Sequence, residues 1–440
     1  MNEVKELLGL KKNKVKVIKV EEQIELNEKI QVITLVGTTS KVKCPICLKY
    51  TSSVHDKLKP IKIKYNKIVE RKCYLILIKR RFICHRCKKR LVEDLGINLT
   101  NRSISNSLEI KVRKDLLKPN FNIKQIAEDN GISEDKVRNI LVEEMNDYPE
   151  YLKTLPEVIS MDEFAAHTSY GKYALIINDP IRKKTLDILP SRKKDYLLSY
   201  FTRVENRNNV KYVIGDMYET YLIITKIMFK KAKYVVDKFH YVRYIMDALD
   251  GIRKRLQEEY GYNSKEYKLL KNKKNVSLLR KRYIDINWYV YVKRYEKGRY
   301  VYKLPKDILN EILNINDELD RGYDLKELFL DIVNNSNYIN VKQDLLTWIE
   351  LCKESEIQEF VEVSKTIENW LEYIVNSFID KRFNNAYTEG LNNKIKVIKR
   401  NAYGYKNFNF FRLRLLYILN GILSGKSRKI PNKNEKNTKK

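Results

Sequence analysis

The middle of the chain alternates short apolar runs with charged and turn-forming segments, a pattern typical of a sheet whose strands are joined by helices. Three runs rich in branched and aromatic residues predict strands at 158–161, 173–177 and 185–189. A helix, a strand, a helix and a strand are expected after them, at 196–204, 212–214, 221–229 and 234–236. This order predicts a mixed α/β domain. Residues 241–380 then show helical spacing with many Lys and Tyr.

Three of these strands close on an acidic residue. The acids are Asp162, Asp216 and Asp237. Acids at strand ends can converge at one edge of a sheet, so we expect these three to be candidates for a shared site.

Four of the six cysteines form two tight pairs in the N-terminal region. The pairs are Cys44-Pro45-Ile46-Cys47 and Cys84-His85-Arg86-Cys87, with 36 residues between them. Two such knuckles supply the four thiolates of a structural Zn²⁺, whose closed shell leaves no position for catalysis. Strand-like runs at 61–65 and 74–78 predict a β-ribbon between the pairs, with arms longer than usual. Four unrelated free thiols are the competing interpretation. His55 or His85 could replace a cysteine as a zinc ligand, although a solvated position on the basic face is favoured for each.

Residues 123–141 have the pattern of a helix, a turn at Asn130-Gly131 and a second helix capped by Ser133. This arrangement predicts a helix-turn-helix, and its second helix would present Lys136, Arg138 and Asn139 to a DNA major groove. An ordinary pair of helices with a polar face is the alternative.

A segment near the C-terminus, 384–400, predicts a helix with two distinct faces. Apolar residues share one face, and a stripe of amides and charges shares the other: Asn385, Glu389, Asn392, Lys396, Lys399 and Arg400. A charged helix face is usually just solvated. Together with the strand-end aspartates, however, Glu389 completes a set of carboxylates that can hold two divalent metals, while the amides and cations would grip phosphates.

Composition narrows the class of protein. The 440 residues include 87 Lys plus Arg against 56 Asp plus Glu, a formal net charge of +31, which favours a polyanionic partner such as nucleic acid. A 43% apolar content excludes a disordered basic protein, and there is neither a membrane-spanning run nor the apolar core of a signal peptide. The paired cysteines suggest a reducing compartment, so we expect a cytoplasmic, nucleoid-associated protein.

Taken in order, these features resemble a DDE transposase of the ISL-three family of bacterial insertion sequences, over nearly the full chain. The knuckles and the helix-turn-helix come first. The other matching motifs are Ser160-Met161-Asp162-Glu163, Gly215-Asp216-Met217-Tyr218, Val236-Asp237-Lys238-Phe239-His240, Tyr267-Lys268-Leu269-Leu270-Lys271-Asn272, Ile367-Glu368-Asn369-Trp370, the run 384–400 and Ala402-Tyr403-Gly404-Tyr405.

The resemblance implies a multidomain chain in which an α/β RNase H-like catalytic domain with a helical insertion follows a zinc-ribbon-like module and an all-α helix-turn-helix. Asp162, Asp216 and Glu389 would be the catalytic triad and the ligands of Mg²⁺ or Mn²⁺. The expected parts are a zinc module at 1–98, a helix-turn-helix at 99–150, a catalytic core at 151–249 and 361–424, a helical insertion at 250–360 and a basic disordered tail at 425–440.

The implied activity is cleavage of a phosphodiester at the transposon end by metal-activated water, followed by attack of the freed 3′-hydroxyl on target DNA. Synapsis of two ends implies a dimer or higher oligomer on DNA. Asp237 could serve as a metal ligand in place of Asp216, although a structural role at the strand end is favoured. The alternative function is a transposase-derived, repressor-like DNA-binding protein without strand transfer. A recombinase with a tyrosine nucleophile is supported only by the abundance of Tyr.

Overall fold

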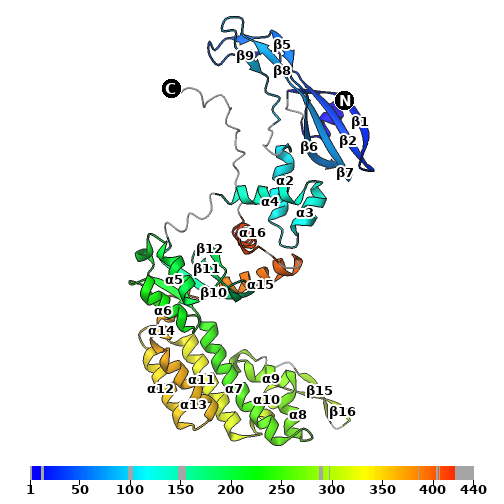
Figure 1. The fold of residues 1–440 in the computed structure, drawn as a ribbon. Helices are drawn as coiled ribbons and strands as arrows, with labels where there is room; N and C mark the ends of the chain where they lie inside the picture. Colours follow the sequence, from blue (N-terminus) through cyan, green and yellow to red (C-terminus); the bar gives the residue numbers. More distant parts are fainter. Residues whose placement is uncertain are drawn as a thin grey trace. The chain divides into compact units, whose positions relative to one another are not determined.

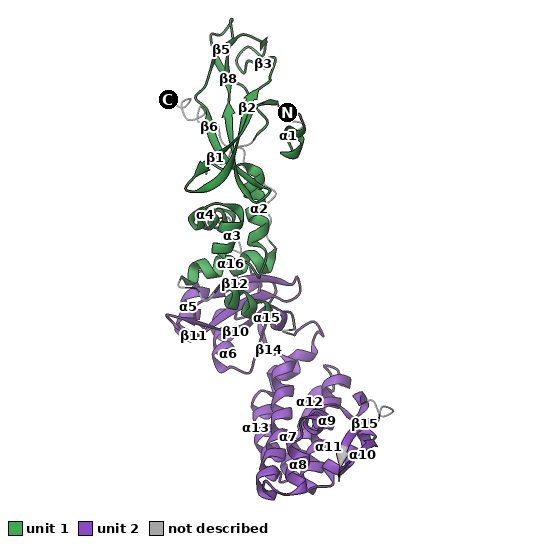
Figure 2. Cartoon of the chain, turned by 90° about the vertical axis from the view of Figure 1, so that its right-hand side faces the viewer, with its two compact units in different colours: residues 1–148, 393–440 green, residues 149–392 purple. Residues whose placement is uncertain are grey.

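The structure, a computed structural model, describes residues 2–10, 14–97, 103–146, 155–286, 291–296, 298–384, 386–402, 405 and 407–421. The chain divides into two compact units (Figure 2). Residues 1–148 and 393–440 belong to unit 1, and residues 149–392 belong to unit 2. The predicted basic tail at 425–440 lies outside the described residues.

Unit 1 is built on a four-stranded sheet in the order β1-β2-β7-β6 (Figure 1). Its strands and the short helix before them are α1 (Asn2–Leu7), β1 (Val15–Glu25), β2 (Glu28–Gly37), β6 (Ile61–Ile68) and β7 (Arg71–Ile78). β1 and β2 form a hairpin, β2 runs parallel to β7, and β7 pairs antiparallel with β6. Leu35, Leu75 and Leu77 are buried in the core of this sheet. The ribbon expected between the cysteine pairs is therefore one half of a larger sheet.

The cysteine pairs lie in two smaller sheets at the far ends of β6 and β7. The strands are β3 (Val42–Lys43), β4 (Tyr50–Thr51), β5 (Val54–Lys57), β8 (Arg80–Ile83) and β9 (Arg90–Val92). Buried Glu93 receives two side-chain hydrogen bonds from Arg80, at 3.0 and 2.8 Å. A Cβ at position 37 would overlap the Glu93 carboxylate, so Gly37 is needed for this close approach.

Three helices of unit 1 form the predicted helix-turn-helix with one helix before it. They are α2 (Asn106–Leu116), α3 (Ile123–Asn130) and α4 (Glu134–Glu144). The turn has the expected chemistry, because Gly131 adopts φ +63° and the Ser133 side chain accepts the Lys136 amide at the start of α4. Backbone pairing between Lys64 of β6 and Ile104 joins these helices to the sheet, so both parts belong to one compact unit.

The last described helix, α16 (Phe408–Asn420), packs on the helix-turn-helix. Buried Arg414 donates to the carbonyl oxygens of Lys118 and Phe121, at 3.3 and 3.2 Å. The Tyr417 hydroxyl donates to the carbonyl oxygen of Arg113 at 3.1 Å. The expected division assigned 361–424 to the catalytic core, whereas residues 393–440 belong to the compact unit that contains the helix-turn-helix. These contacts join residues almost 300 positions apart, which no local pattern reveals.

Unit 2 contains a five-stranded mixed sheet in the order β12-β11-β10-β13-β14. Its elements are β10 (Val158–Thr168), β11 (Gly171–Asp179), β12 (Lys184–Leu189), α5 (Lys194–Thr202), η2 (Arg207–Asn209), β13 (Tyr212–Gly215), α6 (Glu219–Met228) and β14 (Lys233–Val236). β10 pairs antiparallel with β11 and parallel with β13. β10 continues beyond the expected end at 161, because it forms a long hairpin with β11, and Asp162 therefore lies inside the strand.

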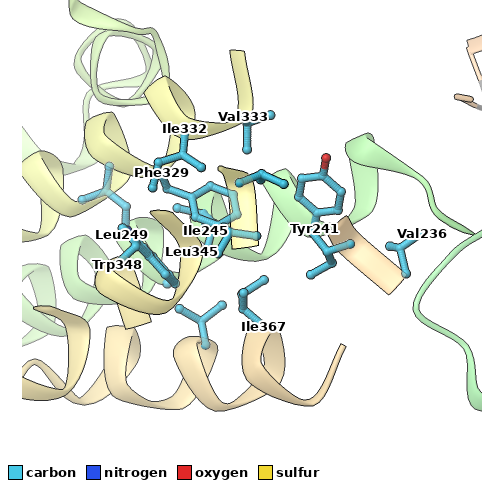
Figure 3. Packing of buried hydrophobic residues seen from close by; sticks show 14 of the residues in the cluster. Val236, Tyr241, Ile245, Leu249, Phe329, Ile332, Val333, Leu345, Trp348 and Ile367 are labelled. Carbon is cyan, nitrogen blue, oxygen red and sulfur yellow. The ribbon is translucent and has the colours of Figure 1, made fainter. Parts of the chain in front are cut away.

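The region after β14 is mostly helical, as the sequence predicts. Its elements are α7 (Lys238–Tyr260), α8 (Lys265–Lys271), α9 (Lys273–Arg280), η3 (Tyr283–Asp285), β15 (Val292–Glu296), β16 (Arg299–Lys303), α10 (Pro305–Leu313), α11 (Asp317–Asn335), α12 (Val341–Glu354), α13 (Gln358–Asn369), α14 (Leu371–Val375) and η4 (Asn376–Phe378). Trp348 and Phe329 pack with a 4.7 Å centroid separation at the centre of its core (Figure 3). The β15–β16 hairpin is an addition that the sequence analysis did not predict.

α15 (Ala386–Asn401) connects this region to α16, and the boundary between the units falls inside it. Its apolar face is buried as expected, through Leu391, Ile395 and Ile398. No helix among the described residues is both long and apolar enough to cross a membrane.

Candidate active site and zinc centre

Parallel strand pairing sets Asp162 and Asp216 side by side. The parallel pairing ends where Ser160 of β10 lies opposite Ile214 of β13, and Asp162 and Asp216 each follow two residues later. The charge of Asp162 acts on Asp216, so the two carboxyls lie near each other. Asp237 occupies the next position across the sheet, because its amide donates to the carbonyl oxygen of Gly215 at 2.8 Å. The three acids therefore line neighbouring strands at the same edge of the sheet.

The Asp216 carboxyl lies in a confined, acidic position. Burial, together with the negative charges of Glu163 and Asp162, raises the pKa of Asp216 to about 7, while Arg192 opposes the rise. The Tyr234 hydroxyl donates to the Asp216 backbone carbonyl at 2.7 Å, and a Cβ on Gly215 would overlap that hydroxyl. Asp216 Oδ1 is buried and has no hydrogen-bond partner among the described residues.

Each oxygen of the Asp162 carboxylate accepts one hydrogen bond. The Glu163 amide donates to Oδ1 at 2.7 Å, and Asn392 Nδ2 donates to Oδ2 at 3.0 Å. Burial raises the pKa of the Asp162 carboxyl, while these donors and the charge of His240 oppose the rise. Asn392 Oδ1 is also buried without a partner among the described residues.

Contacts with the sheet fix the first half of α15, which carries Glu389. Buried Thr388 accepts a hydrogen bond from Asn178 of β11 at 2.9 Å, one turn before the Asn392 contact with Asp162. Glu389 is exposed and lies three residues before Asn392, which places the two on neighbouring positions of one helix face. The helix thus presents Glu389 beside the residue that binds Asp162.

These residues fit a divalent metal by their chemistry. Mg²⁺ prefers oxygen ligands, retains several waters and is often held by one or two carboxylates. Asp216 Oδ1 and Asn392 Oδ1 are unpaired oxygens, and Asp162 and Asp216 are neighbouring acids. The carboxylate oxygens of the three acids do not form a preassembled metal site. In the described part of the chain, the only group of three or more potential ligands within 4.8 Å of one another is made of cysteines.

That cluster contains Cys44, Cys47, Cys84 and Cys87, the four predicted zinc ligands. Both knuckles have the same backbone, because the residue after each second cysteine (Leu48 or Lys88) has positive φ and donates its amide back to the first cysteine's carbonyl. The backbone amide of Lys49 and hydrogen bonds with the other three cysteines lower the pKa of the Cys47 thiol to about 7. Four converging sulfurs with one acidified thiol suit Zn²⁺.

The remaining predicted DNA-binding residues are placed unevenly. On α4, Lys136 is half-buried and Asn139 is exposed, while Arg138 bonds to Glu134 and lies 4.8 Å from the Phe410 ring. On α15, Lys396 and Arg400 are exposed, and Lys399 is half-buried. Asn392 is hydrogen-bonded to Asp162. Asn385 lies outside the described residues.

Comparison with known proteins decides the family. The sequence model of the ISL3 (ISL-three) family of DDE transposases, described as "Transposase", matches residues 159–415 of the chain. The chain belongs to this family. The match confirms the resemblance found in the sequence and includes all three proposed catalytic acids.

Two curated relatives are also similar over part of the chain. One is the "Transposase for insertion sequence element IS1001" of Bordetella parapertussis, 26% identical over 59% of this chain and 60% of that protein. The other, an "ATP-dependent protease" of Lactococcus lactis subsp. lactis, is 32% identical over 28% of this chain and 37% of that protein. The chain thus spans less than two thirds of each relative.

The sequence analysis missed a second group of residues, which lies beside Asp162 and Asp216. Glu163 receives an ion-pair hydrogen bond from Arg192 and another, at 3.0 Å, from the buried Tyr221 hydroxyl. The Arg192 guanidinium also lies over the rings of Tyr173 and Tyr218, 4.4 and 4.8 Å from their centres. The only local signal was that Glu163 directly follows Asp162. This group fixes the charges that surround Asp216.

The raised pKa of Asp216 predicts how stability depends on pH. Because its pKa is near 7 when folded and 3.8 ordinarily, the folded chain binds more protons than the unfolded chain between these values. The free energy of unfolding in Mg²⁺-free buffer should therefore fall as pH rises from about 5 to 8, by on the order of 2 kcal/mol. Urea denaturation at both pH values measures it. Asp216→Asn should remove most of this fall, and equal pH dependence in both proteins would contradict the assignment.

Proposed function

We propose that the chain cleaves DNA at the terminal inverted repeats of an insertion sequence and transfers the resulting 3′-hydroxyl end to target DNA. The observation that supports this proposal is the register of β10 and β13, whose parallel pairing ends two residues before Asp162 and Asp216. The Asn392 contact with Asp162 then brings the helix that carries Glu389 to the same edge. Membership of a transposase family supplies the reaction class.

The catalytic domain is proposed to be RNase H-like. Its support is a sheet in which three antiparallel strands precede two parallel ones, in the order β12-β11-β10-β13-β14. The helices from α7 to α14 separate β14 from α15, which suits an insertion between the second and third acids.

Asp162, Asp216 and Glu389 are the proposed holders of Mg²⁺ or Mn²⁺, with the Asn392 amide oxygen as a further available donor. When bound, such a metal supplies Lewis-acid activation of water and stabilises charge on the leaving oxygen. The side chains of the protein would position the metal ligands and the DNA. Asn392 orients the Asp162 carboxylate, and exposed Lys396 and Arg400 further along α15 are proposed to contact phosphates.

End recognition is proposed for the zinc module and helix-turn-helix. Exposed Asn139 and half-buried Lys136 on α4 are proposed to contact DNA. Arg138 needs to leave Glu134 and Phe410 before it can contact a base or phosphate. Two ends and two catalytic sites require at least a dimer on DNA.

A cleavage assay tests the proposed function. Purified chain is mixed with a labelled duplex that carries the element's terminal repeat, with Mg²⁺ or Mn²⁺ and without either metal. We expect a metal-dependent break at the repeat boundary, followed by joining to an added target duplex. Specific binding of the repeat without any break under either metal would instead support the repressor-like alternative.

A further inference from the structure

The β15–β16 hairpin separates its side chains onto two faces. Lys293 lies opposite Tyr302, and Arg294 lies opposite Val301. Because side chains alternate along a strand, Lys293, Tyr300 and Tyr302 share one face, while Val292, Arg294 and Val301 share the other. Tyr300 and Tyr302 thus share one side of the hairpin with Lys293.

The second face anchors the hairpin to unit 2. Val292 packs against the hydrophobic core, and Arg294 donates to the side-chain oxygen of Asn275 at 2.6 Å. Asn275 is itself buried and donates to the carbonyl oxygen of Leu269 at 2.9 Å. These contacts fix which side of the hairpin faces the protein.

The first face is open to solvent. Tyr300 and Tyr302 are each 63% exposed, and Lys293 Nζ lies 4.0 Å from the centre of the Tyr300 ring. The surrounding sequence is strongly basic, since residues 265–303 contain 13 Lys or Arg and three Asp or Glu. Lys271, Lys273 and Lys274 on or beside α8 and α9 are also exposed.

We propose that this hairpin face binds single-stranded DNA. Cations attract the phosphates, and exposed rings offer stacking surfaces that unpaired bases can cover. A duplex backbone or an acidic protein surface would satisfy the cations but leave the ring faces without a matching partner. The proposal takes DNA as its ligand from the proposed function, and it adds a second binding surface remote in sequence from the helix-turn-helix.

Fluorescence anisotropy of the full chain in Mg²⁺-free buffer tests the proposal, with a labelled 12-nucleotide thymidine strand and a mixed-sequence duplex of equal length. The Tyr300→Ala/Tyr302→Ala double variant should bind the single strand at least about tenfold more weakly and the duplex as wild type does. Tyr300→Phe/Tyr302→Phe should retain binding, because its rings remain. Tyr338→Ala, which removes another exposed tyrosine of the helical region, is the matched control and should also bind normally.

The cations have a separate readout. Lys293→Gln should reduce the slope of log affinity against log salt by about 0.7 for the single strand. Unchanged single-strand affinity in the double alanine variant, with an unchanged melting temperature, would overturn the proposal. An equal loss for strand and duplex would also overturn it, because it would assign the face to duplex DNA. The anisotropy experiment does not depend on cleavage. A chain that fails to cleave transposon ends would therefore contradict the proposed function and leave this proposal unaffected.

Discussion

Strand cleavage should fall at least about a thousandfold when Asp162 or Asp216 is replaced by Asn, or Glu389 by Gln. Each change keeps the side-chain size but removes a carboxylate charge that the proposed metal site needs. Asp162 and Asp216 are neighbours across parallel strands, and Glu389 lies beside the Asn392 that binds Asp162. Single-turnover cleavage of a labelled terminal-repeat duplex measures the effect.

Binding of that duplex should stay within about twofold of wild type, because the proposed recognition elements lie in the zinc module and helix-turn-helix. Glu354→Gln provides a matched control, since Glu354 is an exposed helical glutamate of unit 2 outside the site. Its cleavage rate should be that of wild type. A triad variant that cuts within tenfold of wild type would remove that residue from the proposed site.

Cys44→Ser should eliminate bound zinc and weaken binding of the terminal repeat by at least about tenfold. Cys44 is fully buried, and together with Phe82, Cys84 and Leu91 it makes up the small core of the cysteine region. A core of this size cannot hold its sheets without the metal, because structural zinc supplies much of the folding free energy of such modules. Elemental analysis and a gel-shift titration measure the two effects.

Cys73→Ala is the matched control for the zinc prediction. Cys73 is also buried, but it lies in the core of the four-stranded sheet and outside the cluster. Burial raises the pKa of its thiol to about 11, which suits an inert core residue. The variant should keep its zinc. Zinc bound at the wild-type level by Cys44→Ser would show that the four cysteines do not form the site.

Local sequence patterns predicted the sheet of unit 2 well, because its strands are short apolar runs bounded by turns. The predicted runs at 173–177 and 234–236 lie within β11 and β14. β10 was underestimated, since its second half is mixed in polarity and becomes a strand only by pairing with β11. The β1–β2 and β15–β16 hairpins were missed for a related reason, as their exposed faces carry alternating charges and tyrosines that dilute the apolar signal.

Long-range contacts were beyond sequence reasoning. The spacing of Asp162, Glu163 and Arg192 does not reveal that Arg192 binds Glu163 beside Asp216. The stripe on α15 was predicted as a single functional face, but Asn392 turns inward to Asp162 while Lys396 stays exposed. Helix periodicity predicts the helix face on which a side chain lies. The residue that it contacts is known only from the packed structure.

The central claim is that Asp216 holds a catalytic divalent metal, and exchange of its ligand atom tests this most directly. In Asp216→Cys a softer sulfur replaces the carboxylate oxygens, and Mn²⁺ accepts sulfur more readily than Mg²⁺ does. We predict that Asp216→Cys does not cut the terminal repeat with Mg²⁺ and regains measurable cleavage with Mn²⁺, whereas Asp216→Asn stays inactive with both. Wild-type cleavage by Asp216→Cys in Mg²⁺, or no advantage over Asp216→Asn in Mn²⁺, would contradict the claim.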